Sequence, residues 1–365
     1  MTTLSYEAIR AAAGLLPRPD RGLLLVSGAD RLTWLQGLLT NDVVALRPGT
    51  GCYAAWLTPQ GRMISDLRVL HVGPAVLLDV PAVTRAPLLE RFDRFIIMED
   101  VRVEDWSGRL ARLGLHGPAA ASMLADALPA VWTGPDRGQV SLERLVGLDE
   151  HASVLVPGPV DAEAGPAAFD VPPGHVLIVG TREGGVPGFD LFVDAASETP
   201  VRNALAARGA VPVDTETWNV VRIEAATPVF GADMDEDTIP LEAGIEDRAI
   251  SFTKGCYVGQ EVIVRVRDRG HGRVARRLVG LAAPAGGVLP AVAAGDGLRA
   301  GDKDVGRVTS AAFSPILGRT IALGYVQRDF AAPGASVDAV RDVAVVPLVV
   351  VPTPFVAGDP AEWLP

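Results

Sequence analysis

Lysine and cysteine are the residues that this 365-residue chain has least of. Among 33 basic residues only Lys254 and Lys303 are lysines, so 31 are arginines, and the only thiols belong to Cys52 and Cys256. Two cysteines so far apart do not form a disulfide framework. Lysine is a compact charge whose pKa shifts readily on burial, and a cation beside a thiol favours the reactive thiolate. Lys254 and Cys256 therefore indicate a site, the alternative being a glycine-rich turn with Cys256 as a small buried residue.

Long apolar runs and a basic N-terminal leader are also missing. No segment approaches the roughly 18 apolar residues that a membrane span requires, and the first residues lack the features of a signal peptide. We therefore expect a soluble, cytoplasmic protein of two or three domains with no membrane partner. The net charge of −11 argues against strong direct nucleic-acid binding, which depends on neutralising phosphates.

One basic segment departs from this acidic average. Arg265, Arg267 and Arg269 alternate with other residues, and three more arginines follow by position 277. A period of two predicts a strand with the three guanidinium groups on one face. That face is either solvated or a surface for a carboxylate, a phosphate or an acidic partner.

Two segments share a strand–helix–strand pattern, which is typical of α+β units and hints at an internal duplication. The predicted elements are 76–80, 83–95 and 96–98 with 101–103 in the first unit, and 190–193, 198–208 and 210–213 in the second. Residues 157–173 are rich in Pro, Gly and Ala and predict a long loop between the units. A helix is predicted over 216–224, ending before Pro228.

After residue 274 the pattern is almost entirely that of strands separated by Gly and Pro turns, which predicts a small antiparallel barrel or sandwich. We therefore divide the chain into a first α+β unit (1–105), a second (106–270) and a C-terminal β-barrel domain (271–365), and the two units may interleave.

Three blocks of residues carry a family resemblance. The first comprises 35–43 and 53–62, the second 222–225, 231–236, 240–244 and 254–261, and the third 305–310, 314–315 and 321–326. Together and in this order they resemble the YgfZ/GcvT family of folate-binding proteins, which includes the glycine-cleavage aminomethyltransferase. The resemblance implies two ferredoxin-like α+β units and an antiparallel β-barrel around a central cavity, with a tetrahydrofolate as cofactor.

The segment 254–261, Lys-Gly-Cys-Tyr-Val-Gly-Gln-Glu, resembles the YgfZ-like branch. That resemblance implies a folate-binding accessory protein for iron–sulfur enzymes, including tRNA-modifying ones, with iron–sulfur client or assembly proteins as partners. The alternative is a true aminomethyltransferase. The resemblance places the family's catalytic Asp shortly after residue 79, but residues 80–92 contain no Asp. Asp79 itself could substitute for it. A cluster bound by this chain alone is not expected, because clusters take four thiolates or two with two His.

The resemblance also implies the site residues. Cys256 and Lys254 are predicted to be catalytic, and no metal ligands are expected. The predicted folate-binding set is Glu224, Arg222, Tyr257, Gln260, Asn41 and Phe230. A pterin offers N–H groups that suit a buried carboxylate, here Glu224, and a folate tail ends in carboxylates that suit arginine. Without the resemblance, Arg222 and Glu224 would be a surface ion pair or helix-end charges, and Asn41 a helix-end and turn residue. Cys52 is predicted to be a core residue, because residues 53–57 have the pattern of a strand.

Overall fold

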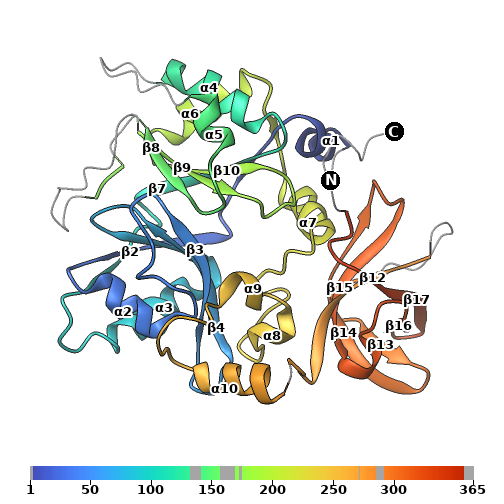
Figure 1. Ribbon diagram of the computed structural model, residues 1–365. Helices are drawn as coiled ribbons and strands as arrows, with labels where there is room; N and C mark the ends of the chain where they lie inside the picture. The colour runs from blue at the N-terminus through green and yellow to red at the C-terminus, as the bar shows by residue number, and fades with distance from the viewer. Residues whose placement is uncertain are drawn as a thin grey trace.

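The computed structural model describes residues 3–131, 141–156, 169–171, 175–270, 272–284 and 292–356. These residues form two sheets and a closed six-stranded barrel, arranged around a helical segment that joins them (Figure 1). The predicted α+β fold of two ferredoxin-like units followed by a β-barrel is confirmed.

The first sheet is antiparallel and has the strand order β3-β4-β5-β2-β6. Its strands are β2 (Arg21–Ser27), β3 (Gly51–Leu57), β4 (Met63–His71), β5 (Val76–Pro81) and β6 (Arg102–Asp105). Helices α2 (Arg31–Leu38) and α3 (Ala82–Asp93) cover one face, where Trp56 stacks on Phe92 with ring centroids 4.5 Å apart.

The second sheet has the order β11-β1-β7-β10-β9-β8, so the N-terminal strand lies inside a sheet made mostly of later residues. Its strands are β1 (Gly14–Pro17), β7 (Leu110–His116), β8 (Ser153–Val156), β9 (Val176–Thr181), β10 (Gly188–Asp194) and β11 (Val211–Pro212). The helices of this part are α1 (Thr3–Ala11), α4 (Ala120–Val131), α5 (Leu142–Val146) and α6 (Glu198–Ala206).

The two sheets pack against each other through their inner faces. In β2, Leu24 and Val26 face the helices of the first unit, whereas Leu23 and Leu25 face a shared core with Phe192 of β10. Because side chains alternate along a strand, residues at every second position of β4, β5, β7 and β10 also enter this interface. The candidate active site lies at this interface between the two sheets.

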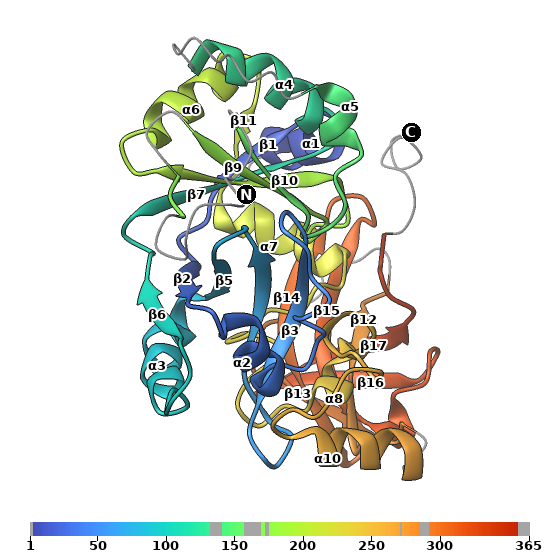
Figure 2. The same ribbon diagram turned by 60° about the vertical axis from the view of Figure 1, so that its left-hand side comes forward.

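The barrel closes in the order β12-β15-β14-β13-β16-β17. Its strands are β12 (Arg276–Ala282), β13 (Gly297–Ala300), β14 (Lys303–Ser314), β15 (Arg319–Gln327), β16 (Ser336–Arg341) and β17 (Ala344–Val351), with a 3-10 turn at Arg328–Phe330. The joining segment contains α7 (Thr215–Glu224), α8 (Pro240–Ala243), α9 (Glu246–Ala249) and α10 (Gln260–Val264). In both ribbon views α7 lies between the second sheet and the barrel (Figure 1, Figure 2).

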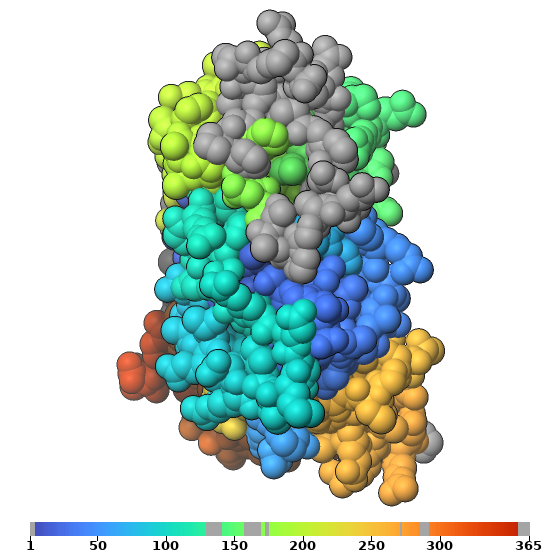
Figure 3. Space-filling view, turned by 90° about the vertical axis from the view of Figure 1, so that its left-hand side faces the viewer, coloured from blue at the N-terminus to red at the C-terminus, as the bar shows by residue number. Residues whose placement is uncertain are grey.

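Two local predictions are wrong. The arginine-rich segment is not a strand: Arg265–Arg269 continues α10 as a π-helical turn, and Figure 3 shows this part at the lower edge of the surface. Ile263 and Val266 enter the core at helical spacing, a period that the alternating arginines concealed. Residues 96–98 are no strand either, and Ile97 and Met98 are 82% and 94% exposed.

Most of the predicted loop 157–173 lies outside the described residues. Across the described ranges, none of the helices combines the length and the hydrophobicity needed to span a membrane.

Candidate active site

A cavity of about 210 Å³ opens where the first sheet, the second sheet and α7 meet. Its walls come from the link between β1 and β2, from β3 and β4, from α7 and from the segments 227–232 and 245–248. Leu16, Trp218, Val229 and Ile245 supply apolar walls, while the floor is strongly polar.

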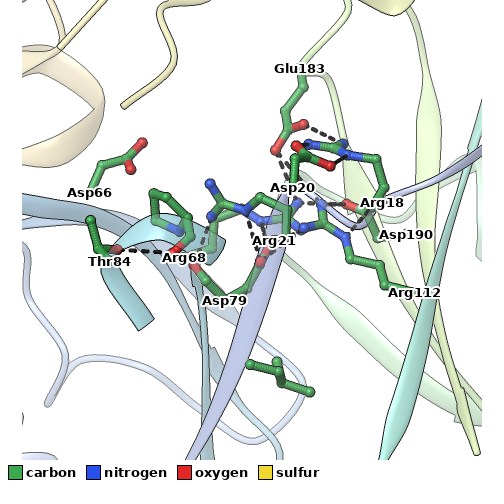
Figure 4. A network of polar contacts seen from close by, with 12 residues as sticks. Arg18, Asp20, Arg21, Asp66, Arg68, Asp79, Thr84, Arg112, Glu183 and Asp190 are labelled. Carbon is green, nitrogen blue, oxygen red and sulfur yellow. Dashed lines mark hydrogen bonds and ion pairs between the residues drawn. The ribbon is translucent and has the colours of Figure 1, made fainter. Parts of the chain in front are cut away.

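At and beneath the floor lies a network of four arginines and four carboxylates, in which Asp20 is 46% exposed and the other members are buried or largely so (Figure 4). Its members are Arg18, Arg21, Arg68, Arg112, Asp20, Asp79, Glu183 and Asp190. The network joins the two sheets, because Asp79 belongs to β5 and Asp190 to β10. With equal numbers of both charges it is neutral overall, so it leaves little net charge for a ligand.

Arg68 is central to this network. It pairs with Asp79, and its Nη1 donates to Asp190 Oδ2 at 2.7 Å. Burial alone would raise the pKa of Asp79, but the guanidinium groups of Arg112, Arg21 and Arg68 outweigh burial and lower that pKa to about 2. These ion pairs therefore fix the shape of the cavity floor at neutral pH.

Asp66 differs from these carboxylates. It lies on β4 two residues before Arg68, on the same face of the strand, and is 5% exposed. In Figure 4 no contact joins it to an arginine. Tyr53 donates to its Oδ2 at 2.7 Å, and its Oδ1 has no hydrogen-bond partner among the described residues. Burial raises the pKa of Asp66, although Arg21 and the Tyr53 hydrogen bond act in the opposite direction. A cavity-lining carboxyl with a raised pKa and an open oxygen can exchange a proton with a ligand.

His151 is a second cavity-lining group with an open position. It is 7% exposed, and its Nδ1 has no hydrogen-bond partner within the described ranges. Burial, with the nearby Arg68 and Arg248, lowers its pKa to about 3, so the imidazole is neutral at physiological pH. Its backbone has a φ of 66°, a conformation that L-residues adopt rarely and that concentrates at functional sites.

Of the eight predicted site residues, Arg222 is the one that lines this cavity. Glu224, two positions further along α7, points to a different side of the helix. It is fully buried and accepts hydrogen bonds from Tyr6, Arg10 and Ser314. Its predicted contact with a pterin stays a prediction.

Lys254 has an unexpected environment. Its Nζ donates to the carbonyl oxygens of Gln36, Leu39 and Asn41 at 2.6, 2.5 and 3.0 Å. These oxygens lie at the C-terminal end of α2 and just beyond it, where unpaired carbonyls attract a cation. Burial lowers the pKa of Lys254 to about 8, while Asp42 and Cys52 act against this shift. Lys254 therefore caps the C-terminal end of α2, and its catalytic role stays a prediction.

The other predicted residues are spread over the same region without lining the cavity. Tyr257 is buried, with its ring centroid 5.0 Å from Lys254 Nζ, and Phe230 is buried in the core of the joining segment. Asn41 donates to the carbonyl oxygens of Tyr53 and Arg248. Gln260 begins α10.

The two thiols differ in exposure. Cys256 is exposed, whereas Cys52 is half-buried against the core of the first unit. Burial raises the pKa of Cys52 to about 12, with Lys254 opposing. Within the described residues no group of His, Cys, Asp and Glu side chains could hold a metal ion.

Sequence reasoning missed Asp66, His151 and the arginine network. Asp66 and Arg68 had a usable signal: they occupy alternate positions of a nine-residue strand in which every residue is buried. Charged residues are almost never fully buried unless paired, so two of them on one face of an apolar strand indicate a polar site. His151 had no comparable signal, because it precedes a short strand in a loop.

Comparison with known proteins is consistent with this architecture. Residues 2–133 match the GCVT N-terminal domain, and residues 276–357 match the glycine cleavage T-protein C-terminal barrel domain. A solved aminomethyltransferase T of the glycine cleavage system from Bartonella henselae superposes with a TM-score of 0.81 at 21% identity, covering 97% of this chain and 89% of that one.

Two similar sequences are named aminomethyltransferase. An aminomethyltransferase of Thermosynechococcus vestitus is 32% identical over 96% of this chain and 86% of its own length. One of Rubrobacter xylanophilus is 30% identical over 96% and 85%. The chain belongs to the family of the glycine cleavage T-protein.

These relatives correct the interpretation drawn from residues 254–261. An accessory role for iron–sulfur enzymes, with iron–sulfur partners, is contradicted, because relatives named aminomethyltransferase match nearly the whole chain. The argument against a transferase relied on the missing Asp in 80–92. The carboxylate of Asp79, which could substitute for it, is held by three arginines. Asp66 on β4 also lines the cavity, and its Oδ1 has no hydrogen-bond partner among the described residues.

Proposed function

We propose that this protein is a folate-dependent aminomethyltransferase of the glycine-cleavage type. The observation that carries the proposal is the carboxyl of Asp66, buried in the central cavity with one open oxygen, in a chain whose relatives are named aminomethyltransferase. Tetrahydrofolate is the proposed co-substrate, since it supplies the amine that accepts the one-carbon unit.

The cavity residues fit the polar ring of such a molecule. Asp66 Oδ1 and His151 Nδ1 are buried polar atoms without partners among the described residues, and leaving them unpaired costs free energy that a ligand would recover. Leu16 and Trp218 offer apolar surface to the faces of a flat ring. The combination suits a planar heterocycle whose edges donate and accept hydrogen bonds.

Asp66 has the properties that the transfer needs. The aminomethyl carbon forms bonds to two amines of the folate, each of which loses a proton. Its bonds to the original amino group and to the carrier sulfur break, so ammonia and the carrier thiol leave, each with one of these protons. A single carboxyl can accept a proton from an acceptor amine and return it to a leaving group, provided its pKa lies closer to neutrality than that of a free aspartate. Burial shifts the pKa of Asp66 in this direction. Tyr53 holds the carboxyl in place.

The test is reconstitution. The purified protein, mixed with the other glycine-cleavage components and tetrahydrofolate, is expected to form methylene-tetrahydrofolate well above the rate without it. An Asp126→Asn variant, changed on the distant helix α4, serves as the matched control for Asp66→Asn. Absence of turnover by the wild-type protein, with a known aminomethyltransferase active in the same mixture, would refute the proposal.

A further inference from the structure

Arg222 lines the cavity, but its guanidinium also makes hydrogen bonds to Asp233 and Ser310, which do not line the cavity. Its Nε donates to Asn219 Oδ1 at 2.8 Å, its Nη1 pairs with Asp233, and its Nη2 donates to Ser310 Oγ at 2.6 Å. Ser310 lies on the barrel strand β14, so one edge of this guanidinium is held by a different domain.

Asp233 is held by the same strand. Thr309 and Ser310 both donate to Asp233 Oδ1, at 2.6 and 2.7 Å. The other oxygen of Asp233 receives Arg222 and the backbone N–H of Val229. All four side chains of this cluster are buried.

It is unusual that Thr309 and Ser310 donate to the same oxygen, because successive side chains of a strand point to opposite faces. An irregularity in β14 removes the conflict. Val308 pairs with Gly324 and Ser310 pairs with Leu323, so Thr309 is an extra residue in the ladder. Bulges of this kind re-aim side chains and occur next to active sites.

We propose that this bulge makes Thr309, Ser310 and Asp233 positioning residues for Arg222, so that the barrel sets the ligand affinity of a cavity built mainly by the other domains. The orientation of the guanidinium decides which of its donors a ligand meets. The inference rests on the proposed function only for the choice of ligand.

A neighbouring contact supplies a matched control. Ser314, four residues further along β14, donates to the buried carboxylate of Glu224, which does not line the cavity. Ser314→Ala therefore removes a hydroxyl from the same strand and the same helix interface without touching Arg222. Ser310→Thr keeps the hydroxyl and provides the rescue.

The experiment measures tetrahydrofolate binding by calorimetry and melting temperature for the full chain. Ser310→Ala is expected to raise the Kd about tenfold, the effect of losing one charge-assisted hydrogen bond. Ser310→Thr should restore binding, and Ser314→Ala should lower the melting temperature to a similar degree with a Kd within about twofold of wild type. Equal Kd values for wild type and Ser310→Ala, or equal weakening by both alanine variants, would overturn the inference.

A second readout needs no ligand. The side-chain nitrogen NMR signals of Arg222, assigned with an Arg222→Lys variant, should show restricted rotation in the wild type and in Ser314→Ala but faster rotation in Ser310→Ala. Unchanged rotation in Ser310→Ala would overturn the inference. Failure of the wild type to bind tetrahydrofolate would count against the proposed function alone, since the rotation of Arg222 still shows whether Thr309, Ser310 and Asp233 hold its guanidinium.

Discussion

Tyr53 and Asp66 form a hydrogen bond of 2.7 Å across the first two strands of the first sheet, and the bond engages only one of the two carboxylate oxygens. Tyr53 is half-buried, and burial raises the pKa of its phenol well above the usual value, so it remains a donor at every working pH. Tyr53 therefore stabilises the ionised form of Asp66 against the burial that opposes it.

Replacing Asp66 tests the proton-transfer role. Asp66→Asn keeps the size and the Tyr53 contact but cannot accept a proton, so kcat should fall about 10²–10⁴-fold. The KM for tetrahydrofolate should change much less. Steady-state kinetics with Asp126→Asn as control provides the measurement, and a variant that retained more than a tenth of wild-type kcat would remove Asp66 from the reaction.

Replacing Tyr53 tests how the pKa of Asp66 is set. The hydrogen bond from Tyr53 lowers that pKa, so Tyr53→Phe should raise it. The transfer begins with ionised Asp66, hence the acidic limb of the kcat/KM profile should move to higher pH. A limb that stayed in place or moved to lower pH would contradict the assignment.

The arginine network predicts a loss of stability in acid. The pKa of Asp79 is about 2 in the folded protein and close to ~3.9 in the unfolded chain. Stability from a lowered carboxyl pKa is present above the unfolded value and is lost as the pH falls through the folded one, so the free energy of unfolding should drop between about pH 4 and pH 2. Urea midpoints across this range measure the drop.

Asp79→Asn separates this contribution from general acid effects. Removing the carboxylate leaves buried guanidinium groups short of a partner, which should cost about 3–5 kcal/mol at neutral pH. The acid-dependent loss should become shallower at the same time. Asp329→Asn is the control, because the side chain of Asp329 is 75% exposed. An unchanged acid slope in Asp79→Asn would mean that another group dominates.

The capping role of Lys254 is testable through stability. Lys254→Met leaves three backbone carbonyls near the end of α2 without their donor, and should cost about 2–3 kcal/mol. Lys303→Met, at an exposed position, should cost less than about 0.5 kcal/mol. Equal melting temperatures for the two variants would contradict the cap.

The cysteines should label at different rates. Cys256 is exposed, whereas burial holds the pKa of the Cys52 thiol near 12 and leaves it protonated. Iodoacetamide should therefore modify Cys256 first, as timed alkylation with peptide mapping would show. Equal labelling of both thiols would mean that the environment of Cys52 opens in solution.

The fold was largely predictable, because periodicity and block order depend on residues close together in the sequence. The strand at 76–80 and the helix that follows it appear near their predicted positions, and the chain after residue 274 forms the strands of a barrel as predicted. The arginine run failed for a physical reason: Val264 and Val266 favour strands locally, but Ile263 and Val266 reach the core only if the chain continues as a helix.

The site was less predictable, since it depends on which side each residue faces in three dimensions. Arg222 reaches the cavity while Glu224, two residues away, is enclosed by α1 and the barrel. Composition drew attention to Lys254, but its three carbonyl partners are more than 210 residues away in sequence. The alternation of Asp66 with Arg68 along an apolar strand indicates a polar site, but the open oxygen of Asp66 is visible only in the structure.

The pairing of β1 with β7 and β11 has a consequence for biosynthesis. The first sheet needs only residues up to 105, so it can form early as the chain leaves the ribosome. The N-terminal helix cannot make its native contacts at that stage, because the hydrogen-bond partner of Tyr6 is Glu224, 218 residues later in the chain. The first helix made can thus be held by Glu224 only after more than half of the chain has been made, and its contacts of high sequence separation should make its docking a slow step in folding.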